Sequence, residues 1–163
     1  MTYLLTIDSG NTHVKWGLHD GSNWLEQGIF AQDKSILLQQ AWKNLPTPHD
    51  IIISNVSSIE TKKKLSKFLS CWKAKPRWIT PLKYQCGVRN YYADPSLLGS
   101  DRWAALIAAW NWQQRGCLIV DAGTAMTVDA LSDTGEFLGG IIVPGFELMK
   151  KALTTNIITL QNQ

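Results

Sequence analysis

Apolar and polar positions alternate near the start of the chain in a way that is typical of a β-hairpin. A largely apolar stretch over residues 4–7 leads into the polar run 8–12, with the sequence Asp-Ser-Gly-Asn-Thr, and apolar residues then recur at every second position from 14 to 18. A period of two is the pattern of a strand that buries one face. We therefore predict two antiparallel strands joined by a polar tip.

The polar tip contains groups that suit a phosphate. Gly10 can adopt backbone angles that are closed to other residues, and the backbone N–H groups of the tip, with the side chains of Asn11 and Thr12, can cradle a phosphate. Asp8, at the end of the first strand, can hold a hydrated metal ion beside it. Gly and Asn are also the ordinary residues of a hairpin turn, so the motif alone fits either interpretation.

A second copy of the motif favours the phosphate interpretation. Asp121, followed by Ala-Gly-Thr, lies 113 residues after Asp8 and directly behind the apolar run 117–120. The same offset matches Leu18 with Leu131, Asp20 with Asp133, Leu25 with Leu138 and Ile29 with Ile142. We therefore expect an internal repeat.

The first half of the chain predicts the element order strand, strand, strand, helix, strand, helix, strand. After the hairpin, the pattern predicts a strand over 23–30, a helix over 36–45, a buried strand over 51–53, a helix over 59–72 and an edge strand over 77–80. This order is that of a ribonuclease H-like domain, which is an α/β fold. We expect chemistry where the Asp8 turn and the loop with Asn55 leave the same end of the sheet.

The second half predicts a shorter version of the same pattern. Residues 81–98 show no firm periodicity and are expected to form a loop, and a helix rich in Ala and Leu should follow, with Ser100 as its cap and Gly116 at its end. The further elements expected are strands over 117–121, 127–131 and 137–143 and a helix over 146–153. We therefore predict a first ribonuclease H-like domain at 1–98, a linking helix at 99–116 and an incomplete second domain at 117–163.

Composition favours a globular protein of the cytoplasm. Hydrophobic residues make up 45% of the 163 positions, and no apolar run approaches the roughly 20 residues of a membrane span. The first residues lack a basic and then apolar signal sequence. The three cysteines show no C-x-x-C spacing, the net charge is +3, and the basic run 62–64 lies in a helical pattern. We expect no disulfide framework, no zinc site, and neither a membrane nor nucleic acid as a partner.

Asp101 and Arg102 stand in the first turn of the predicted linking helix. The helix dipole alone favours a carboxylate there, so a purely structural role for Asp101 is an open alternative. Arg102 offers a planar fork for a carboxylate or phosphate of a substrate. Gly140, in the third strand of the second repeat, fits either the close approach of a nucleotide or a strand bulge.

Four motifs in order make the chain resemble a known enzyme family. They are Asp8-Ser9-Gly10-Asn11-Thr12; Tyr92-Ala93-Asp94-Pro95 running into Gly99-Ser100-Asp101-Arg102; Asp121-Ala122-Gly123-Thr124-Ala125-Met126-Thr127-Val128-Asp129; and Gly139-Gly140-Ile141-Ile142-Val143-Pro144-Gly145. Each motif alone is weak, but their joint order and spacing resemble type III pantothenate kinase, the family that includes the Bvg accessory factor proteins. The resemblance covers essentially the whole chain.

The resemblance implies a fold and an activity. The family belongs to the actin, hexokinase and sugar-kinase superfamily, in which two ribonuclease H-like halves clasp ATP in a cleft, and this agrees with the internal repeat. Its members transfer the γ-phosphate of ATP to the hydroxyl of pantothenate, the first step toward coenzyme A. The resemblance also implies Mg²⁺, a monovalent cation (K⁺ or NH₄⁺) and a homodimer.

The resemblance further implies roles for individual residues. The residues that match the phosphate and metal motif are Asp8, Gly10, Asn11 and Thr12. Asp101 matches the general base, and the matches to substrate contacts are Tyr92, Gly99, Asp101 and Arg102. Asp121 matches a monovalent-cation ligand and Thr124 an ATP contact. Lys15 matches no invariant family position and is only a candidate neighbour of the phosphates.

Two other classes of function are open. One is a non-catalytic regulatory or binding protein on the same scaffold, because family members continue through further strands and helices that complete the nucleotide side of the cleft and much of the dimer interface. The other is a metal-dependent nuclease, whose two-metal carboxylate site would comprise Asp8, Asp101, Asp121 and Asp129. The two Gly-containing turns, which suit a nucleotide's phosphates, and the lack of a basic groove signature disfavour the nuclease.

Overall fold

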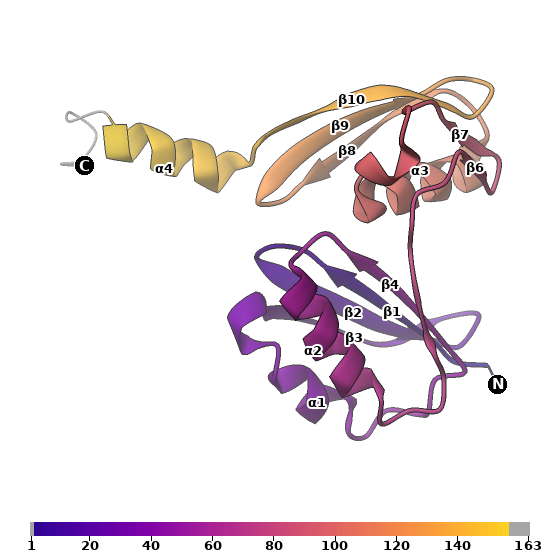
Figure 1. Ribbon diagram of the computed structural model, residues 1–163, viewed down its shortest axis with the longest axis vertical. Helices are drawn as coiled ribbons and strands as arrows, with labels where there is room; N and C mark the ends of the chain where they lie inside the picture. The colour runs from indigo at the N-terminus through magenta and orange to yellow at the C-terminus, as the bar shows by residue number, and fades with distance from the viewer. Residues whose placement is uncertain (1, 157–163) are drawn as a thin grey trace. The chain divides into compact units, whose positions relative to one another are not determined.

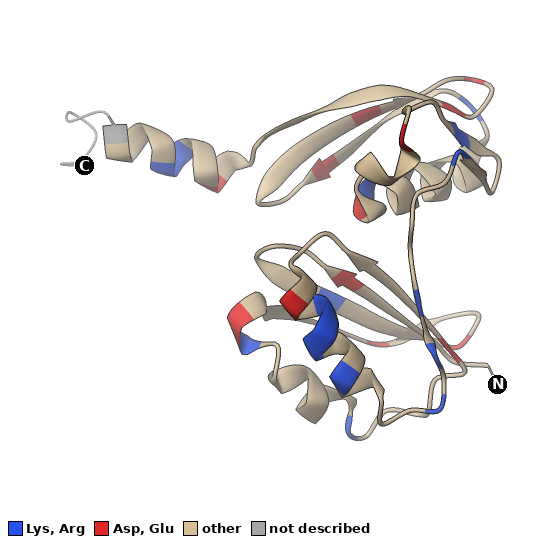
Figure 2. Ribbon diagram, viewed as in Figure 1, with Lys and Arg blue, Asp and Glu red and all other residues tan. Residues whose placement is uncertain are grey.

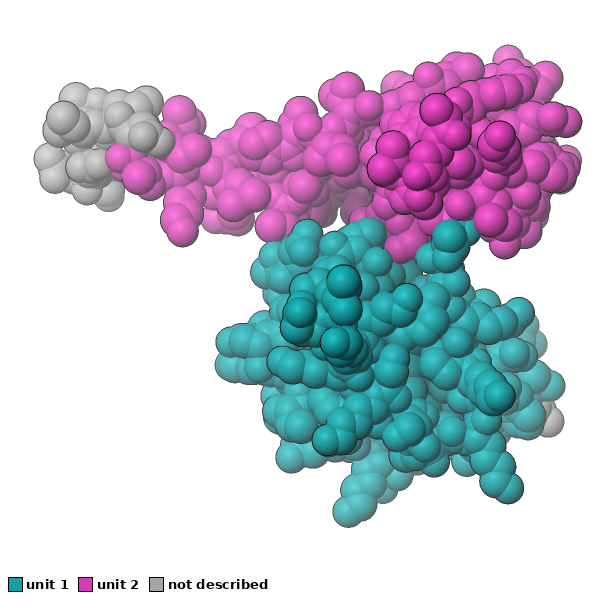
Figure 3. Space-filling view, in the orientation of Figure 1, with its two compact units in different colours: residues 1–80 teal, residues 81–163 magenta. Residues whose placement is uncertain are grey.

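The computed structural model describes residues 2–156 and divides the chain into two compact units. Unit 1 comprises Met1–Thr80 and unit 2 comprises Pro81–Gln163 (Figure 3). The segment 81–98, which the sequence analysis placed with the first domain, belongs to unit 2 together with the helix predicted as a linker. The division therefore lies between Thr80 and Pro81.

Unit 1 is built on a five-stranded sheet in the order β3-β2-β1-β4-β5. Its strands are β1 (Leu4–Ser9), β2 (His13–His19), β3 (Trp24–Ala31), β4 (Asp50–Asn55) and β5 (Pro76–Trp78). The first three are antiparallel neighbours, whereas β4 and β5 run parallel to β1. A 3₁₀-helix η1 (Gln32–Lys34) and helix α1 (Leu37–Trp42) connect β3 to β4, and α2 (Ile59–Leu69) connects β4 to β5. The predicted order of elements is confirmed.

Both helices of unit 1 cover the same face of its sheet (Figure 1). Every second residue of β1 is buried, as at Leu5 and Ile7, and these side chains form one core with Trp42 of α1 and Leu65 of α2. Successive strand residues point to opposite faces, so the residues between them, including Asp8, lie on the face away from the helices. Asp8 is half-buried there.

Unit 2 is built on a second five-stranded sheet in the order β6-β7-β10-β9-β8. Its strands are β6 (Tyr84–Gln85), β7 (Val88–Asn90), β8 (Cys117–Ala122), β9 (Ala125–Leu131) and β10 (Glu136–Pro144). Helix α3 (Ser100–Gln113) packs against this sheet with Trp103 and Leu106 buried, and α4 (Phe146–Asn156) follows β10 (Figure 1). The three predicted antiparallel strands are present as β8, β9 and β10, and β7 adds to β10 in parallel.

The prediction of a loop over 81–98 was wrong. Strands β6 and β7 form a hairpin there, and a 3₁₀-helix η2 (Pro95–Leu97) precedes α3. The hairpin turns at Cys86 and Gly87, whose φ angles are 50° and 83°, and the indole of Trp110 lies against Gly87. The two strands contain two and three residues, which is too few for a period of two to be visible in the sequence.

Helix α3 differs from its prediction at both ends. Gly99 rather than Ser100 is its N-cap residue, and no side chain caps its start. The helix ends at Gln113 instead of Gly116, because Gln114 takes a left-handed conformation with a φ of 45°. A left-handed residue ends a helix, and it is usually glycine, so a glutamine at this position did not indicate the end of the helix.

The internal repeat is present, but its spacing changes at the hairpin tip. Leu5 of β1 pairs with Leu18 of β2, and Leu118 of β8 pairs with Ala130 of β9. Leu18 therefore corresponds to Ala130, and its predicted match with Leu131 was wrong by one residue. The cause is the connecting loop, which is one residue shorter between β8 and β9 than between β1 and β2.

The basic run 62–64 lies on a solvated helix face, as predicted. Lys62, Lys63, Lys64 and Lys67 are all exposed on α2, where Figure 2 shows basic residues in blue. The Lys62 ammonium lies 4.8 Å from the ring centre of Trp78. Over the described part of the chain, no helix is long and apolar enough to cross a membrane.

Candidate active site

Two backbone hydrogen bonds close the tip of the first hairpin. The N–H of Gly10 donates to the carbonyl of His13 (3.0 Å), and the N–H of Gln32 donates to the carbonyl of Thr12 (2.8 Å). Because the Gly10 N–H is occupied inside the hairpin, it is not one of the N–H groups that the tip can offer to a phosphate. Asn11 and Thr12 are both exposed at the tip.

Asp8 lies at the base of this tip. Its register partners are Lys15 in β2 and Ser54 in β4, and directly paired residues share a face of the sheet, so the exposed Lys15 is a neighbour of the Asp8 carboxylate. Within residues 2–156, no three His, Cys, Asp or Glu side chains gather around a metal position. A Mg²⁺ ion here would rely on Asp8, water and phosphate oxygens, which is a usual environment for this ion.

The second hairpin tip repeats the arrangement with different residues. The N–H of Gly123 donates to the carbonyl of Ala125 (3.1 Å), and the N–H of Gly145 donates to the carbonyl of Thr124 (2.9 Å). A Cβ at Gly145 would overlap the carbonyl oxygens of Gly123 and Thr124, so this close approach requires glycine. Asp121 and Thr124, the predicted cation and ATP contacts, are both exposed at this tip.

The start of α3 holds one oxygen of Asp101 in place. Gly99 is extended before the helix (φ −61°, ψ 141°), and Oδ1 of Asp101 accepts a hydrogen bond from the N–H of Arg102 (2.7 Å). The Asp101 side chain is half-buried. Its Oδ2 makes no recorded hydrogen bond to any described residue, so this oxygen can accept a bond from a substrate.

The guanidinium of Arg102 is held by a buried carboxylate. Nε donates to both oxygens of Asp129 (3.1 and 3.0 Å), and Nη2 also donates to Oδ1. The two residues are only 9% and 1% exposed. The hydrogen bonds to Asp129 raise the pKa of Arg102 above its usual value, although burial acts in the opposite direction. The fork that the sequence analysis assigned to a substrate is thus largely occupied by Asp129.

Gly140 makes room for this ion pair. It lies on β10 in register with Asp129 of β9, and a Cβ there would overlap Oδ1 of Asp129 and lie 2.7 Å from Nη2 of Arg102. The neighbouring Gly139 has a φ of 126° at a register shift in β10. The bulge therefore lies at Gly139, whereas the missing side chain of Gly140 leaves space for Arg102 and Asp129.

Aromatic rings lie beside the Arg102 guanidinium. The ring centre of Phe137 in β10 is 5.8 Å from it, and the rings of Tyr92 and Phe137 are 5.5 Å apart between centres. The Tyr92 N–H donates to Oδ1 of Asn90 (3.0 Å), a buried residue at the end of β7. The predicted substrate contacts Tyr92, Asp101 and Arg102 therefore lie within one part of unit 2.

The sequence analysis did not identify the structural roles of two residues at these sites. Asp129 was considered only as a metal-binding carboxylate, although a charged residue within the apolar alternation of a strand is a signal for a buried partner. Gln32, which bonds the first hairpin tip, was not considered. It follows the third strand and precedes a helix, and nothing in its sequence neighbourhood distinguishes it from an ordinary loop residue.

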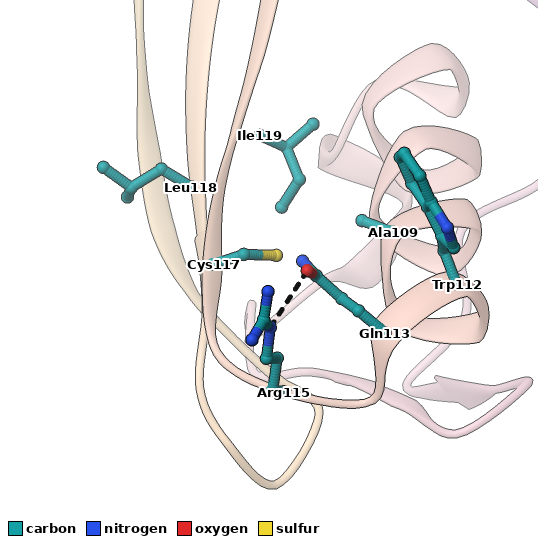
Figure 4. A pocket seen from close by; sticks show the side chains of 7 residues that line it. All are labelled: Ala109, Trp112, Gln113, Arg115, Cys117, Leu118 and Ile119. Atoms are coloured by element: carbon teal, nitrogen blue, oxygen red, sulfur yellow. Dashed lines mark hydrogen bonds between the residues drawn. The ribbon is translucent and has the colours of Figure 1, made fainter.

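Cavities of the two units lie away from these residues. In unit 2, a cavity of about 520 Å³ opens between the end of α3 and β8, with Trp112, Gln113, Cys117 and Leu118 in its lining (Figure 4). Nε of Arg115 donates there to Oε1 of Gln113 (3.2 Å). In unit 1, a cavity of about 550 Å³ is lined by residues of α1, α2 and the segment after α2. Neither lining contains a predicted site residue.

Solved structures share the fold. One solved structure, described as a 2-dehydro-3-deoxygalactonokinase protein from Sinorhizobium meliloti, matches this chain with a TM-score of 0.62 at 14% sequence identity. The match covers 96% of this chain and 58% of that one. The ethanolamine utilization protein EutJ from Carboxydothermus hydrogenoformans has a TM-score of 0.57 at 9% identity, covering 98% of this chain and 58% of that one. The chain therefore shares the α/β fold of these two proteins.

Sequence comparison identifies the family. The profile of type III pantothenate kinase matches residues 4–162. A protein named type III pantothenate kinase from Nitrosospira multiformis is 59% identical over 160 residues, or 98% of this chain and 61% of that protein. A protein of the same name from Nitrosomonas eutropha is 56% identical over 153 residues, which cover 93% of this chain and 60% of that protein. The chain belongs to the type III pantothenate kinase family and spans about three fifths of these relatives' length.

Proposed function

We propose that the chain forms part of an ATP-dependent pantothenate kinase, which produces 4'-phosphopantothenate in the first step of coenzyme A biosynthesis. The observation that carries this proposal is the 59% identity, over 98% of the chain, to a relative named type III pantothenate kinase. Because the chain spans only 61% of that relative, the activity of the whole protein is part of the proposal.

In this proposal the first hairpin tip binds the phosphates of ATP. The exposed Asn11 and Thr12 would contact phosphate oxygens, Gly10 shapes the turn, and Asp8 would hold Mg²⁺. Lys15, which shares a sheet face with Asp8, adds a positive charge nearby. Phosphoryl transfer through a loose transition state depends mainly on positioning and on neutralising charge, and Mg²⁺ supplies much of that charge when it is bound.

Asp101 is the proposed general base. The N–H of Arg102 fixes its Oδ1, so Oδ2 is left to accept the proton of the pantothenate hydroxyl. The hydroxyl needs to lose its proton only late in a loose transition state. An aspartate with no special activation is sufficient for this step.

The residues around Arg102 are proposed to bind pantothenate. Asp129 takes Nε and Nη2 of Arg102, so the remaining contact to a substrate carboxylate comes from Nη1. Tyr92 and the backbone at Gly99 supply further polar groups. Asp101 and Arg102 are consecutive residues in the first turn of α3, which supports assigning the general base and the pantothenate contact to the same part of the chain.

Several expectations from the sequence stay proposals. Asp121 is proposed to bind a monovalent cation, K⁺ or NH₄⁺, and Thr124 to contact ATP; their exposure at the second tip supports this. The homodimer and the cytoplasmic location are proposed with them. The nuclease alternative loses support, because the Asp129 carboxylate is bound to Arg102 and is not available to a metal. The non-catalytic alternative gains none, since the relatives are named as kinases.

A test of the proposed function uses Asp101→Asn. The unmodified protein should convert pantothenate to its phosphate with Mg·ATP, as detected by mass spectrometry. Asp101→Asn should lower kcat by roughly 10²–10⁴-fold with ATP binding nearly intact, because the amide keeps the shape but does not accept a proton. Exposed Asp33 on η1 supplies the control Asp33→Asn. Unchanged turnover in Asp101→Asn would eliminate the role.

A further inference from the structure

Gln32 bonds the first hairpin tip through both its backbone and its side chain. Its N–H donates to the carbonyl of Thr12 (2.8 Å). Its side-chain Nε2 donates to the carbonyl of Gly10 (3.0 Å) and lies within hydrogen-bond distance of the hydroxyls of Ser9 (3.3 Å) and Ser57 (3.1 Å). One amide group with two hydrogens thus serves three acceptors.

These bonds determine which way the peptide groups of the tip face. In a planar trans peptide, the C=O of one residue and the N–H of the next point in opposite directions. The Gly10 carbonyl is turned toward Gln32, so the N–H of Asn11 is turned away from it. Asn11 is exposed, and in the proposed function its N–H is one of the groups that the tip offers to a phosphate.

The second repeat shows the same backbone bond without the side chain. Lys15 of β2 pairs with Ile29 of β3, and Thr127 of β9 pairs with Ile142 of β10, so the offset of 113 residues applies again in the third strand. At this offset Gln32 corresponds to Gly145, whose N–H donates to the carbonyl of Thr124 (2.9 Å). The backbone bond alone is therefore enough to close a tip.

The side chain of Gln32 adds a link to another loop. Ser57 follows β4 and lies 3.3 Å from the hydroxyl of Thr61, and Ser58 caps α2 by accepting from the Thr61 N–H (3.2 Å). Gln32 thus connects the hairpin tip with the start of α2. Its own Oε1 is buried with no hydrogen-bond partner among the described residues, which costs stability. An apolar side chain of the same length would avoid that cost.

We propose that Gln32 is a positioning residue that fixes the peptide orientation of the Gly10–Thr12 tip and thereby prepares it for a phosphate. The orientation follows from the hydrogen bonds of Gln32. The identity of the ligand rests on the proposed function. Gln32 itself does not touch the phosphate in this assignment.

The test replaces Gln32 by methionine, which keeps the length but removes the donor. Without nucleotide, hydrogen exchange of the Gly10 amide, whose N–H closes the tip by donating to the carbonyl of His13, should become about tenfold faster in Gln32→Met, the effect of about one hydrogen bond. The affinity for Mg·ATP, measured by calorimetry, should fall by a similar factor. Gln27→Met, at an exposed position of β3, is the matched control and should change neither quantity.

A milder variant keeps the test decisive if Gln32→Met does not fold. Ser57→Ala removes only one acceptor and should change exchange at the tip in the same direction by roughly twofold to threefold. Unchanged exchange of the Gly10 amide in folded Gln32→Met, or in Ser57→Ala if only that variant folds, would overturn the inference. Faster exchange with unchanged Mg·ATP affinity would overturn the positioning role. If the unmodified chain does not bind Mg·ATP, the proposed function fails, while the exchange rates still decide whether Gln32 fixes the tip.

Discussion

At the scale of single residues, Arg102, Asp129 and Gly140 depend on one another. A buried carboxylate is costly without a partner, and Arg102 compensates Asp129 through direct hydrogen bonds. The sequence predicted Arg102 as a substrate contact and left two explanations for Gly140. It could not reveal the pair, because the two charges are 27 positions apart and meet only when α3 packs against the sheet.

Gly140→Ala should destabilise unit 2 by about 3 kcal/mol, because the added Cβ displaces the buried ion pair. Urea denaturation followed by circular dichroism measures this loss. Gly123→Ala is the control, since a Cβ there would lie at an ordinary 3.6 Å from its nearest neighbour, the carbonyl oxygen of Ala125. Equal stability of the two variants would contradict the role assigned to Gly140.

Arg102→Lys should raise the KM for pantothenate by roughly tenfold and leave the KM for ATP nearly unchanged. Lysine provides a point charge where arginine pairs with Asp129 through its planar guanidinium and, in the proposed function, also contacts the substrate carboxylate. Steady-state kinetics with each substrate varied in turn separates the two constants, after circular dichroism has verified folding. An effect confined to ATP would assign Arg102 to the other substrate.

At the scale of elements, the long alternating strands were predictable and the short ones were not. The hairpin, the third strand and the buried strand of unit 1 were placed within a few residues, because each has several alternating or continuous apolar positions. Strands β6 and β7 are stabilised by contacts from elsewhere. The indole of Trp110 in α3 lies against both Gly87 and Gly135, and each of these glycines has a positive φ. No local sequence pattern predicts such a contact.

Gly87→Ala should destabilise unit 2 by about 2 kcal/mol more than Gly21→Ala destabilises unit 1. Both glycines have positive φ (83° and 102°), so both variants strain the backbone. Only at Gly87 would the new Cβ enter the Trp110 ring, whereas Gly21 has open space, and overpacking typically costs 1–3 kcal/mol. Chemical denaturation of the two variants measures the difference, and equal losses would exclude the contact with Trp110 as its cause.

At the scale of the whole chain, apolar surface gathers on unit 2. Among the described strands β8 pairs only with β9, whereas β1, its counterpart in unit 1, is flanked on both sides. Leu118 and Val120 on β8 are 70% and 60% exposed.

The 163-residue chain should therefore self-associate or have low solubility. Open strand edges and large apolar patches are usually paired or covered. Sedimentation velocity over a range of concentrations measures the association. Val120→Lys places a charge on the edge strand and should reduce it, whereas Lys64→Ala on the solvated face of α2 should not. A monomer at every concentration would contradict the prediction.

The exposed indole beside this edge gives unit 2 an optical reporter of its own. Trp112 is 90% exposed and lines the cavity next to Leu118 (Figure 4), while Trp103 on the same helix is fully buried. Indoles in water emit at longer wavelengths than indoles in apolar surroundings. When another polypeptide covers β8, Trp112 should shift the summed emission of the eight tryptophans to shorter wavelength, whereas the buried Trp103 should contribute a constant part.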